Sequence, residues 1–166
     1  MIDPIEGLMT IAEIAITLAG FSGLMAAFRA KEAWTPLEQM RLINILLFCF
    51  IVVICALLPI FTTSYFSDSS DPWRLSCFLF GLSYGFLVLR LLWKSLQGEF
   101  RFSQRISYVL SIVAVGVIVV AVTTGLGVGF KATPSLLGLI LMWGLVAAGS
   151  FFILSLQIIW GPRDDQ

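Results

Sequence analysis

Histidine is absent from this 166-residue chain, and charged residues are scarce. Without histidine, the chain lacks the commonest general base of enzymes and the commonest metal ligand of proteins. Charged residues make up 12% of the chain and hydrophobic residues 59%, whereas soluble domains average about 25% charged and about 45–50% apolar residues. The formal net charge is zero, so no positive excess attracts nucleic acid. The composition predicts a membrane protein with no metal site, no cofactor and no nucleic-acid partner.

Cysteine is also scarce, with only Cys49, Cys55 and Cys77 in the chain. The three residues form no CxxC pair, and an odd number is a poor disulfide framework. Cys49 and Cys55 lie inside one apolar segment, and Cys77 lies at the start of another. We expect all three to pack as small apolar side chains, with a metal or redox role as the alternative.

Five long apolar segments occupy most of the chain, and each is close to the roughly 20 residues that a helix needs to cross a bilayer core of about 30 Å. The sequence therefore predicts an all-α, polytopic transmembrane bundle in a single integral membrane domain, with no soluble domain. The predicted helices cover 8–28, 42–66, 75–93, 106–130 and 135–160. An alternative has four membrane helices, with the first segment lying partly in the interface because Glu13 interrupts its apolar run.

Helix starts are marked by a capping residue followed by proline. The side-chain oxygen of the capping residue accepts a hydrogen bond from a free backbone N–H, and proline has no N–H to leave unpaired at the first helical position. We therefore expect the first helix to begin near Pro4 and the second near Pro36. The four pairs are Asp3-Pro4, Thr35-Pro36, Asp71-Pro72 and Thr133-Pro134.

Lysine and arginine lie almost entirely in alternate gaps between the apolar segments. Eight of the ten basic residues lie on one side of the predicted bundle, and only Arg74 and Lys131 lie on the other. Because short cytoplasmic loops are rich in lysine and arginine, this bias predicts an outside N-terminus and a cytoplasmic C-terminus. The predicted cytoplasmic anchors are Arg29, Lys31, Arg41, Arg90, Lys94, Arg101 and Arg105.

One acidic residue, Glu13, lies inside the first predicted helix, about one and a half turns from its outer end. An ionisable side chain at membrane depth is costly and marks a candidate functional site. We predict a polar pocket around it, open to the outside; the alternative is hydroxyl groups that bond the carbonyls of their own helices. The other predicted members of the pocket, all in the outer half of the bundle, are Thr10, Thr17, Thr62, Thr63, Tyr84, Thr123 and Thr124.

Small residues recur at helical spacing on the first, third and fifth predicted helices. Small side chains let the backbones of two membrane helices approach closely. We expect them to pack helices within the bundle, with self-association of the chain as the alternative. The predicted packing residues are Ala19, Gly20, Gly23, Gly81, Gly85, Gly144 and Ala148.

The stretch Ile11–Arg29 contains Ala-Glu-Ile-Ala, then Ala-Gly-Phe-Ser-Gly and a basic end. It resembles the first helix of uncharacterised small multi-pass membrane proteins of bacteria. The resemblance covers about one helix. It implies a bacterial inner-membrane location, and it implies no activity and no site residue.

The sequence leaves two functions open. One is a small oligomeric channel or solute-permeation protein, with Glu13 and the outer-half threonines along the pathway; oligomerisation is needed because five helices barely enclose a path. The other is an accessory or sensory subunit of a larger membrane complex. The predicted partners are membrane lipids, together with further copies of the chain or a larger membrane protein. We predict no enzymatic activity, because the chain has no HExxH motif, no paired intramembrane aspartates and no serine-centred motif.

Overall fold

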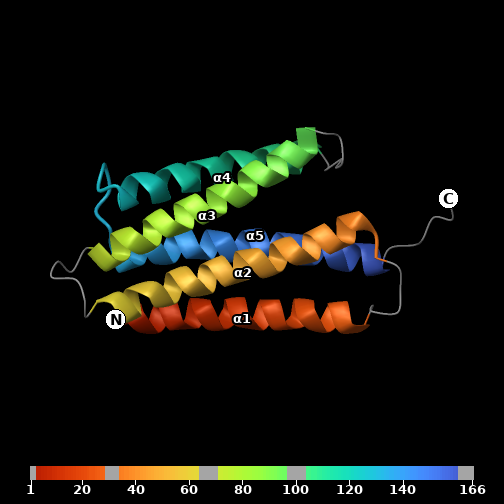
Figure 1. Ribbon diagram of the computed structural model, residues 1–166, viewed down its shortest axis with the longest axis horizontal. Coiled ribbons are helices and arrows are strands. Elements are labelled where there is room, and N and C mark those ends of the chain that lie inside the picture. Colours follow the sequence, from red (N-terminus) through yellow and green to blue (C-terminus); the bar gives the residue numbers. More distant parts are fainter. Residues whose placement is uncertain (1–2, 29–33, 64–70, 97–103, 161–166) are drawn as a thin grey trace.

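The computed structural model describes residues 3–28, 34–63, 71–96 and 104–160, with residues 37, 94–96, 104–110 and 157–160 described as backbone only. These ranges fold into five helices, so the all-α prediction is confirmed. In Figure 1 the helices lie side by side along one axis, and consecutive helices run in opposite directions. The helices are α1 (Pro4–Phe28), α2 (Pro36–Thr62), α3 (Asp71–Leu96), α4 (Gln104–Gly125) and α5 (Pro134–Trp160).

Four of the helices, α1, α2, α3 and α5, are long and apolar enough to cross a membrane. The exception is α4, whose side chains are described only from residue 111 onwards, which leaves the short apolar stretch Ser111–Gly125. The alternative with four membrane helices had placed the weak span at α1, yet α1 has the required length and hydropathy.

The capping residues explain where three helices begin. α1, α2 and α5 each start at the proline that follows the capping residue. At α2, the backbone N–H of Glu38 donates to Thr35 Oγ1 at 3.3 Å, while the N–H of Thr35 donates to Glu38 Oε2 at 2.9 Å. The side chains of Asp3 and Thr133 accept one bond each, from the N–H groups of Ile5 and Leu136. The predicted starts of α1 and α2 at Pro4 and Pro36 are confirmed.

The end of α4 differs from the prediction. The helix ends at Gly125 and not at residue 130. Two glycines beyond it, Gly127 and Gly129, have φ angles of 77° and 93°. These left-handed conformations are easy for glycine and break a right-handed helix. The predicted end of the second helix at residue 66 lies outside the described residues.

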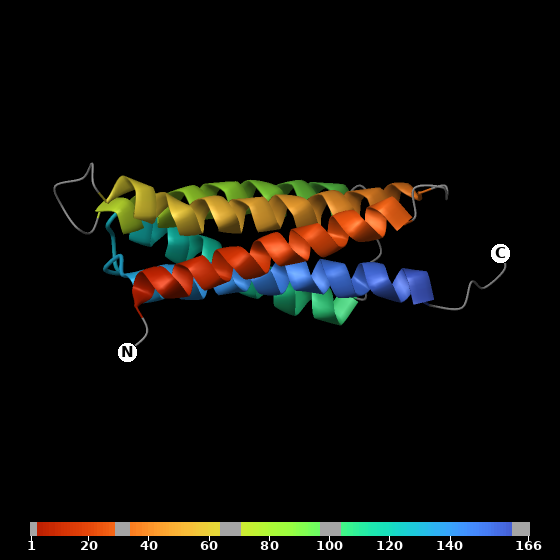
Figure 2. The same cartoon turned by 90° about the horizontal axis from the view of Figure 1, so that it is seen from below.

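The helices form layers, with α2 and α5 in the middle, α1 on one side of them, and α3 and α4 on the other (Figures 1 and 2). α2 packs against α1, α3 and α5, whereas α4 packs mainly against α3. Within the described residues, α1 contacts α2 and α5 but neither α3 nor α4. One side of α1 is therefore left without a neighbouring helix.

Aromatic side chains form the centre of the core, where α2, α3 and α5 meet. The ring of Tyr84 lies 5.4 Å from that of Phe48 and 5.3 Å from that of Phe80, between ring centroids. Phe151 of α5 stacks on Phe48 at 5.8 Å. The indole N–H of Trp143 donates to the hydroxyl of Tyr84 at 2.9 Å, so the polar tip of a buried tyrosine has a partner. The three cysteines are also buried in this core as free thiols.

Glycines on α3 and α5 lie where a neighbouring helix is close. A Cβ atom at Gly81 would meet Val122 of α4 at 2.7 Å. A Cβ at Gly144 would meet Val52 of α2 at 2.8 Å and Phe80 of α3 at 3.2 Å. A Cβ at Gly85 would make only an ordinary contact, with Ile118 of α4 at 3.5 Å, and Ala148 is fully buried. On these two helices, small residues thus sit at the contacts between helices.

The small residues of α1 are divided between its two sides. Ala19 packs against the core, together with the fully buried Ala15. Gly20 and Gly23 are exposed, and a Cβ atom at either would meet no described atom within 4 Å. These two glycines therefore do not pack α1 against the described part of its own bundle.

Candidate functional site

Glu13 lies on the side of α1 that faces away from the other helices. Residues Leu8, Ala12, Ala15 and Ser22 are the buried residues of α1. Glu13 is exposed, on the opposite side of the helix. Four further exposed residues stand in line with it at alternating spacings of four and three, which places them on one face of a helix. We call the set the outward line of α1: Glu6, Thr10, Glu13, Thr17 and Gly20.

The threonines of the outward line are hydrogen-bonded to their own helix. The hydroxyl of Thr10 donates to the carbonyl of Glu6 at 3.0 Å, and that of Thr17 donates to the carbonyl of Glu13 at 2.8 Å. Each hydroxyl oxygen can still accept a hydrogen bond. The line thus offers hydrogen-bond acceptors, in a helix that is otherwise long and apolar enough to span a membrane.

The other predicted pocket residues do not join this line. Thr62 and Thr63 of α2 bond carbonyls of their own helix, those of Leu58 and Ile60. Thr123 of α4 likewise donates to the carbonyl of Val119. These are the bonds expected if each hydroxyl serves its own helix.

The remaining two predicted pocket residues are buried on helices that α1 does not touch. Tyr84 lies in the aromatic core of α3. Thr124 of α4 is fully buried, and its hydroxyl has no described partner. Among the described residues α1 contacts neither α3 nor α4, so Glu13 does not share a pocket with them inside one chain.

The predicted cytoplasmic anchors are only partly described. Arg90 is exposed on α3. Arg41 is different, because its guanidinium crosses to α5 and donates to the carbonyl of Leu154 at 3.2 Å. Arg29, Lys31 and Arg101, and the side chains of Lys94 and Arg105, lie outside the described residues.

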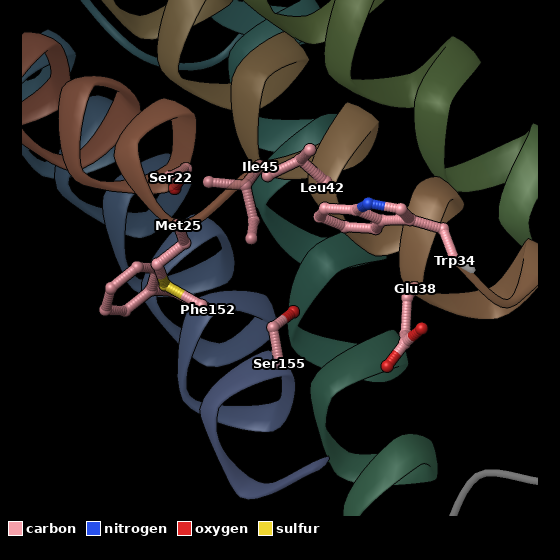
Figure 3. A pocket seen from close by; sticks show the side chains of 8 residues that line it. All are labelled: Ser22, Met25, Trp34, Glu38, Leu42, Ile45, Phe152 and Ser155. Atoms are coloured by element: carbon pink, nitrogen blue, oxygen red, sulfur yellow. The ribbon is translucent and has the colours of Figure 1, made fainter. Parts of the chain in front are cut away.

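A crevice opens at the end of the bundle where α2 begins, between α1, α2 and α5. Its enclosed part has a volume of about 20 Å³, room for roughly one water molecule. In Figure 3, Ser22, Met25 and Phe152 lie on one side of the crevice, and Trp34 and Glu38 lie on the other. The remaining lining residues are Leu42, Ile45 and Ser155.

Sequence reasoning missed this crevice. Glu38 was not singled out as a site residue; it completes a capping box with Thr35, and its side chain is 8% exposed and lines the crevice. An acidic residue one turn into an apolar helix is the signal that was available. The other lining residues come from three separate helices and carry no common pattern in the sequence.

No group of three or more metal-ligating side chains (histidine, cysteine, aspartate or glutamate) comes together among the described residues. The described part of the chain thus contains two candidate sites, the outward line of α1 and the crevice. Compared with protein-family models, curated proteins and solved structures, the chain matches none.

Proposed function

We propose that the chain crosses a bacterial cytoplasmic membrane five times, with its N-terminus outside and its C-terminus in the cytoplasm. The four helices that are long and apolar enough to cross a membrane support the multi-pass arrangement. The fifth span is α4, which runs antiparallel to α3 along its length (Figure 1). The orientation rests on the eight basic residues, out of ten, that fall on one side.

The function proposed here is a small oligomeric channel or solute-permeation protein, in which the outward line of α1 lines the pathway. The outward line itself carries this proposal. The exposed positions of the other helices hold large apolar side chains, as expected of surfaces that meet lipid; examples are Phe50 and Ile54 of α2 and Leu139 of α5. α1 exposes large apolar side chains as well, such as Ile16 and Phe21, but between them it carries the outward line of acids, hydroxyls and glycine.

A carboxyl group in this place is costly if lipid covers it. Glu13 lies roughly 13–14 Å along α1 from Pro4, which is well inside the helix that would cross the bilayer. Translocon measurements put a charged side chain at the centre of a membrane helix at about 2.5–3.5 kcal/mol. Contact with water or with another polar surface removes this cost. A ring of copies with α1 innermost supplies both.

The pathway lies between copies and not within one. The threonines predicted to share a pocket with Glu13 do not converge on it inside a single chain. α1 lies at one side of the layered bundle with its outward line unobstructed by the other described helices (Figure 2). Several copies can therefore bring their α1 helices together around an axis.

The second candidate is a non-catalytic accessory or sensory subunit of a larger membrane complex. The exposed Gly20 and Gly23 favour it equally, because they allow a foreign helix to approach α1 closely. This function needs one polar partner for Glu13 and no pathway.

Native mass spectrometry of the protein in nanodiscs, together with ion and solute flux in liposomes, tests the proposal. We expect a closed ring of several copies and a flux that falls at least tenfold in Glu13→Gln. Asp71→Asn is the matched control, since it makes the same acid-to-amide change at the start of α3. A ring of copies whose flux is unchanged in Glu13→Gln would contradict a pathway along the outward line. A monomer without flux would contradict the channel and direct the search to a larger partner.

A further inference from the structure

Three large apolar side chains are exposed in the turn that joins α4 to α5. Leu126, Val128 and Phe130 are 61%, 64% and 57% exposed. Gly127 and Gly129 stand between them, so residues 126–130 contain no polar side chain. We call these five residues the apolar turn; it lies at the end of the bundle where α1 and α3 begin (Figure 1). Apolar surface of this kind is unfavourable in water.

Hydrogen bonds to the end of α4 fix the conformation of the apolar turn. The N–H of Val128 donates to the carbonyl of Thr123 at 2.9 Å, and the N–H of Gly127 donates to that of Thr124 at 3.0 Å. This pair of bonds is the Schellman motif, in which a residue with positive φ ends a helix. Gly127, with a φ of 77°, is that residue. The backbone is thus held in place while the apolar side chains stay uncovered.

Two basic residues lie at the apolar turn, and they are the two that fall outside the predicted cytoplasmic side. Lys131 directly follows Phe130 and is exposed, and within the described residues it forms no ion pair. The guanidinium of Arg74, from the start of α3, lies against the turn, because a Cβ atom at Gly127 would overlap it. The turn therefore combines apolar side chains with two cations.

Asp71 leaves the guanidinium of Arg74 able to bind a further acceptor. Its Oδ1 atom lies 3.7 Å from Nη1 of Arg74, and both side chains are 39% exposed. That distance is too long for a direct hydrogen bond, and exposed ion pairs are weak. A guanidinium has five N–H donors, and phosphate oxygens are among its preferred acceptors.

The apolar turn lies at the level of a membrane surface. The candidate span of α5 begins at Pro134, four residues after Phe130, and α4 ends at Gly125, directly before the turn. At such a surface, hydrocarbon lies next to the phosphate groups of the lipids. Lysine and arginine side chains near the end of a membrane helix reach toward these headgroups.

We propose that the apolar turn inserts into the membrane surface, with Leu126, Val128 and Phe130 below the lipid phosphates and Arg74 and Lys131 bound to those phosphates. The partner is the phospholipid itself, whose hydrocarbon matches the three side chains and whose phosphate oxygens match the two cations. The inference rests on the crossing of the membrane by α5, and it needs neither a ring of copies nor flux.

A nitroxide spin label attached to Val128→Cys reports where the turn lies. The three native cysteines are at most 3% exposed and should react little, and the parent treated in the same way gives the background. In nanodiscs of phosphatidylcholine and phosphatidylglycerol, collisions of the label with oxygen, which concentrates in hydrocarbon, are compared with collisions with a nickel chelate, which stays in water. Asp3→Cys, at the start of α1, is the polar reference, and Leu139→Cys, on the exposed side of α5, is the lipid reference.

We expect the oxygen-to-nickel collision ratio at Val128→Cys to approach that at Leu139→Cys and to exceed that at Asp3→Cys at least fivefold. A ratio equal to that at Asp3→Cys places the turn in water and overturns the proposal. Few collisions with either reagent would show that protein covers the turn, which also overturns it. A water-like ratio at Leu139→Cys would overturn the membrane crossing of α5 as well, so the two failures are distinguishable.

Charge changes at Lys131 test the contact with phosphate. Lys131→Glu brings a like charge to the phosphates, so we expect the label at Val128→Cys to move toward water, with nickel collisions at least doubled. Lys131→Gln and Arg74→Gln should act in the same direction by less, and Lys131→Arg should keep the depth of the parent. An unchanged depth in Lys131→Glu overturns the phosphate contact, and if that variant fails to insert, Lys131→Gln decides in its place.

Discussion

The outward sides of α1 and α3 show the same helical spacing, but a polar line runs along α1 where α3 has apolar residues. On α3 the exposed residues at spacings of four, three and four are Leu82, Phe86, Leu89 and Trp93, which are 51–68% exposed. On α1 the corresponding positions form the outward line with Glu13 at its middle. Both helices are long and apolar enough to cross a membrane. The four exposed positions of α3 are all apolar, whereas on α1 a polar line runs between exposed apolar residues such as Ile14 and Phe21. An exposed face is therefore not automatically one that lipid covers completely.

The largest effect is expected from giving α3 the chemistry of α1. Leu82→Glu places a carboxyl group near the middle of α3, and no residue three or four positions away has a polar side chain. We expect a loss of about 2.5–3.5 kcal/mol in membrane insertion or in the free energy of unfolding. Yield in the membrane fraction and thermal unfolding measure it, with Leu82→Phe as the control. If both variants behave alike, the face of α3 is also covered and the comparison fails.

The next test uses two glycines, one at a contact between helices and one on an exposed side of α1. Gly144→Ala adds a methyl group 2.8 Å from a side-chain atom of Val52, so we expect destabilisation by about 1–3 kcal/mol. Gly20→Ala meets no described atom within 4 Å, and alanine favours the helix by up to about 1 kcal/mol. Unfolding in a detergent that holds the chain as single copies measures both variants. A large loss in Gly20→Ala would show that α1 packs on its own chain there.

Giving α1 the chemistry of α3 should weaken assembly without harming the fold. In Glu13→Leu the centre of the outward line becomes apolar, and a polar contact between copies is lost. We expect the dissociation constant between copies to rise at least tenfold, which is about 1.4 kcal/mol. Native mass spectrometry across a range of protein-to-lipid ratios measures it. Ile14→Leu, at an exposed neighbour, is the control; equal effects in the two variants would argue against a polar interface.

The sequence predicted where helices begin better than it predicted where their sides face. Proline after a capping residue fixed the starts of α1, α2 and α5, because that signal is local and acts through the backbone. The direction of a side chain in a membrane helix depends on which neighbours pack against it. Helices that are apolar all round carry no stripe that marks the core. The prediction placed Glu13 beside Thr123 only because both were expected in the outer half of the bundle. Their helices do not touch in the described structure.

The crevice shows the same limit, since no local signal joins its walls. Ser22 of α1, Ile45 of α2 and Ser155 of α5 come together only through the packing of three helices. The end of α4 could have been placed more closely, because glycines alternate from Gly125 to Gly129 and two of them adopt positive φ. Residues that set the local backbone conformation can be recognised in the sequence. Contacts between residues far apart in the sequence cannot.

The smallest expected effect concerns the inward side of α3. There a polar group, the hydroxyl of Tyr84, is buried, whereas the outward side of the same helix is apolar. Tyr84 places a hydroxyl in the core and receives the indole N–H of Trp143 at 2.9 Å. Hydrogen bonds between membrane helices contribute about 0.6 kcal/mol on average. We expect this coupling energy from a double-mutant cycle of Tyr84→Phe and Trp143→Phe, measured by unfolding in detergent, because the cycle cancels the loss of packing area. A coupling near zero would mean that a polar group inside the bundle gains little from its partner. A hydrogen bond to a neighbouring helix would then stabilise Glu13 only weakly. Contact with water in a pathway would better explain why Glu13 lies on the outward side of α1.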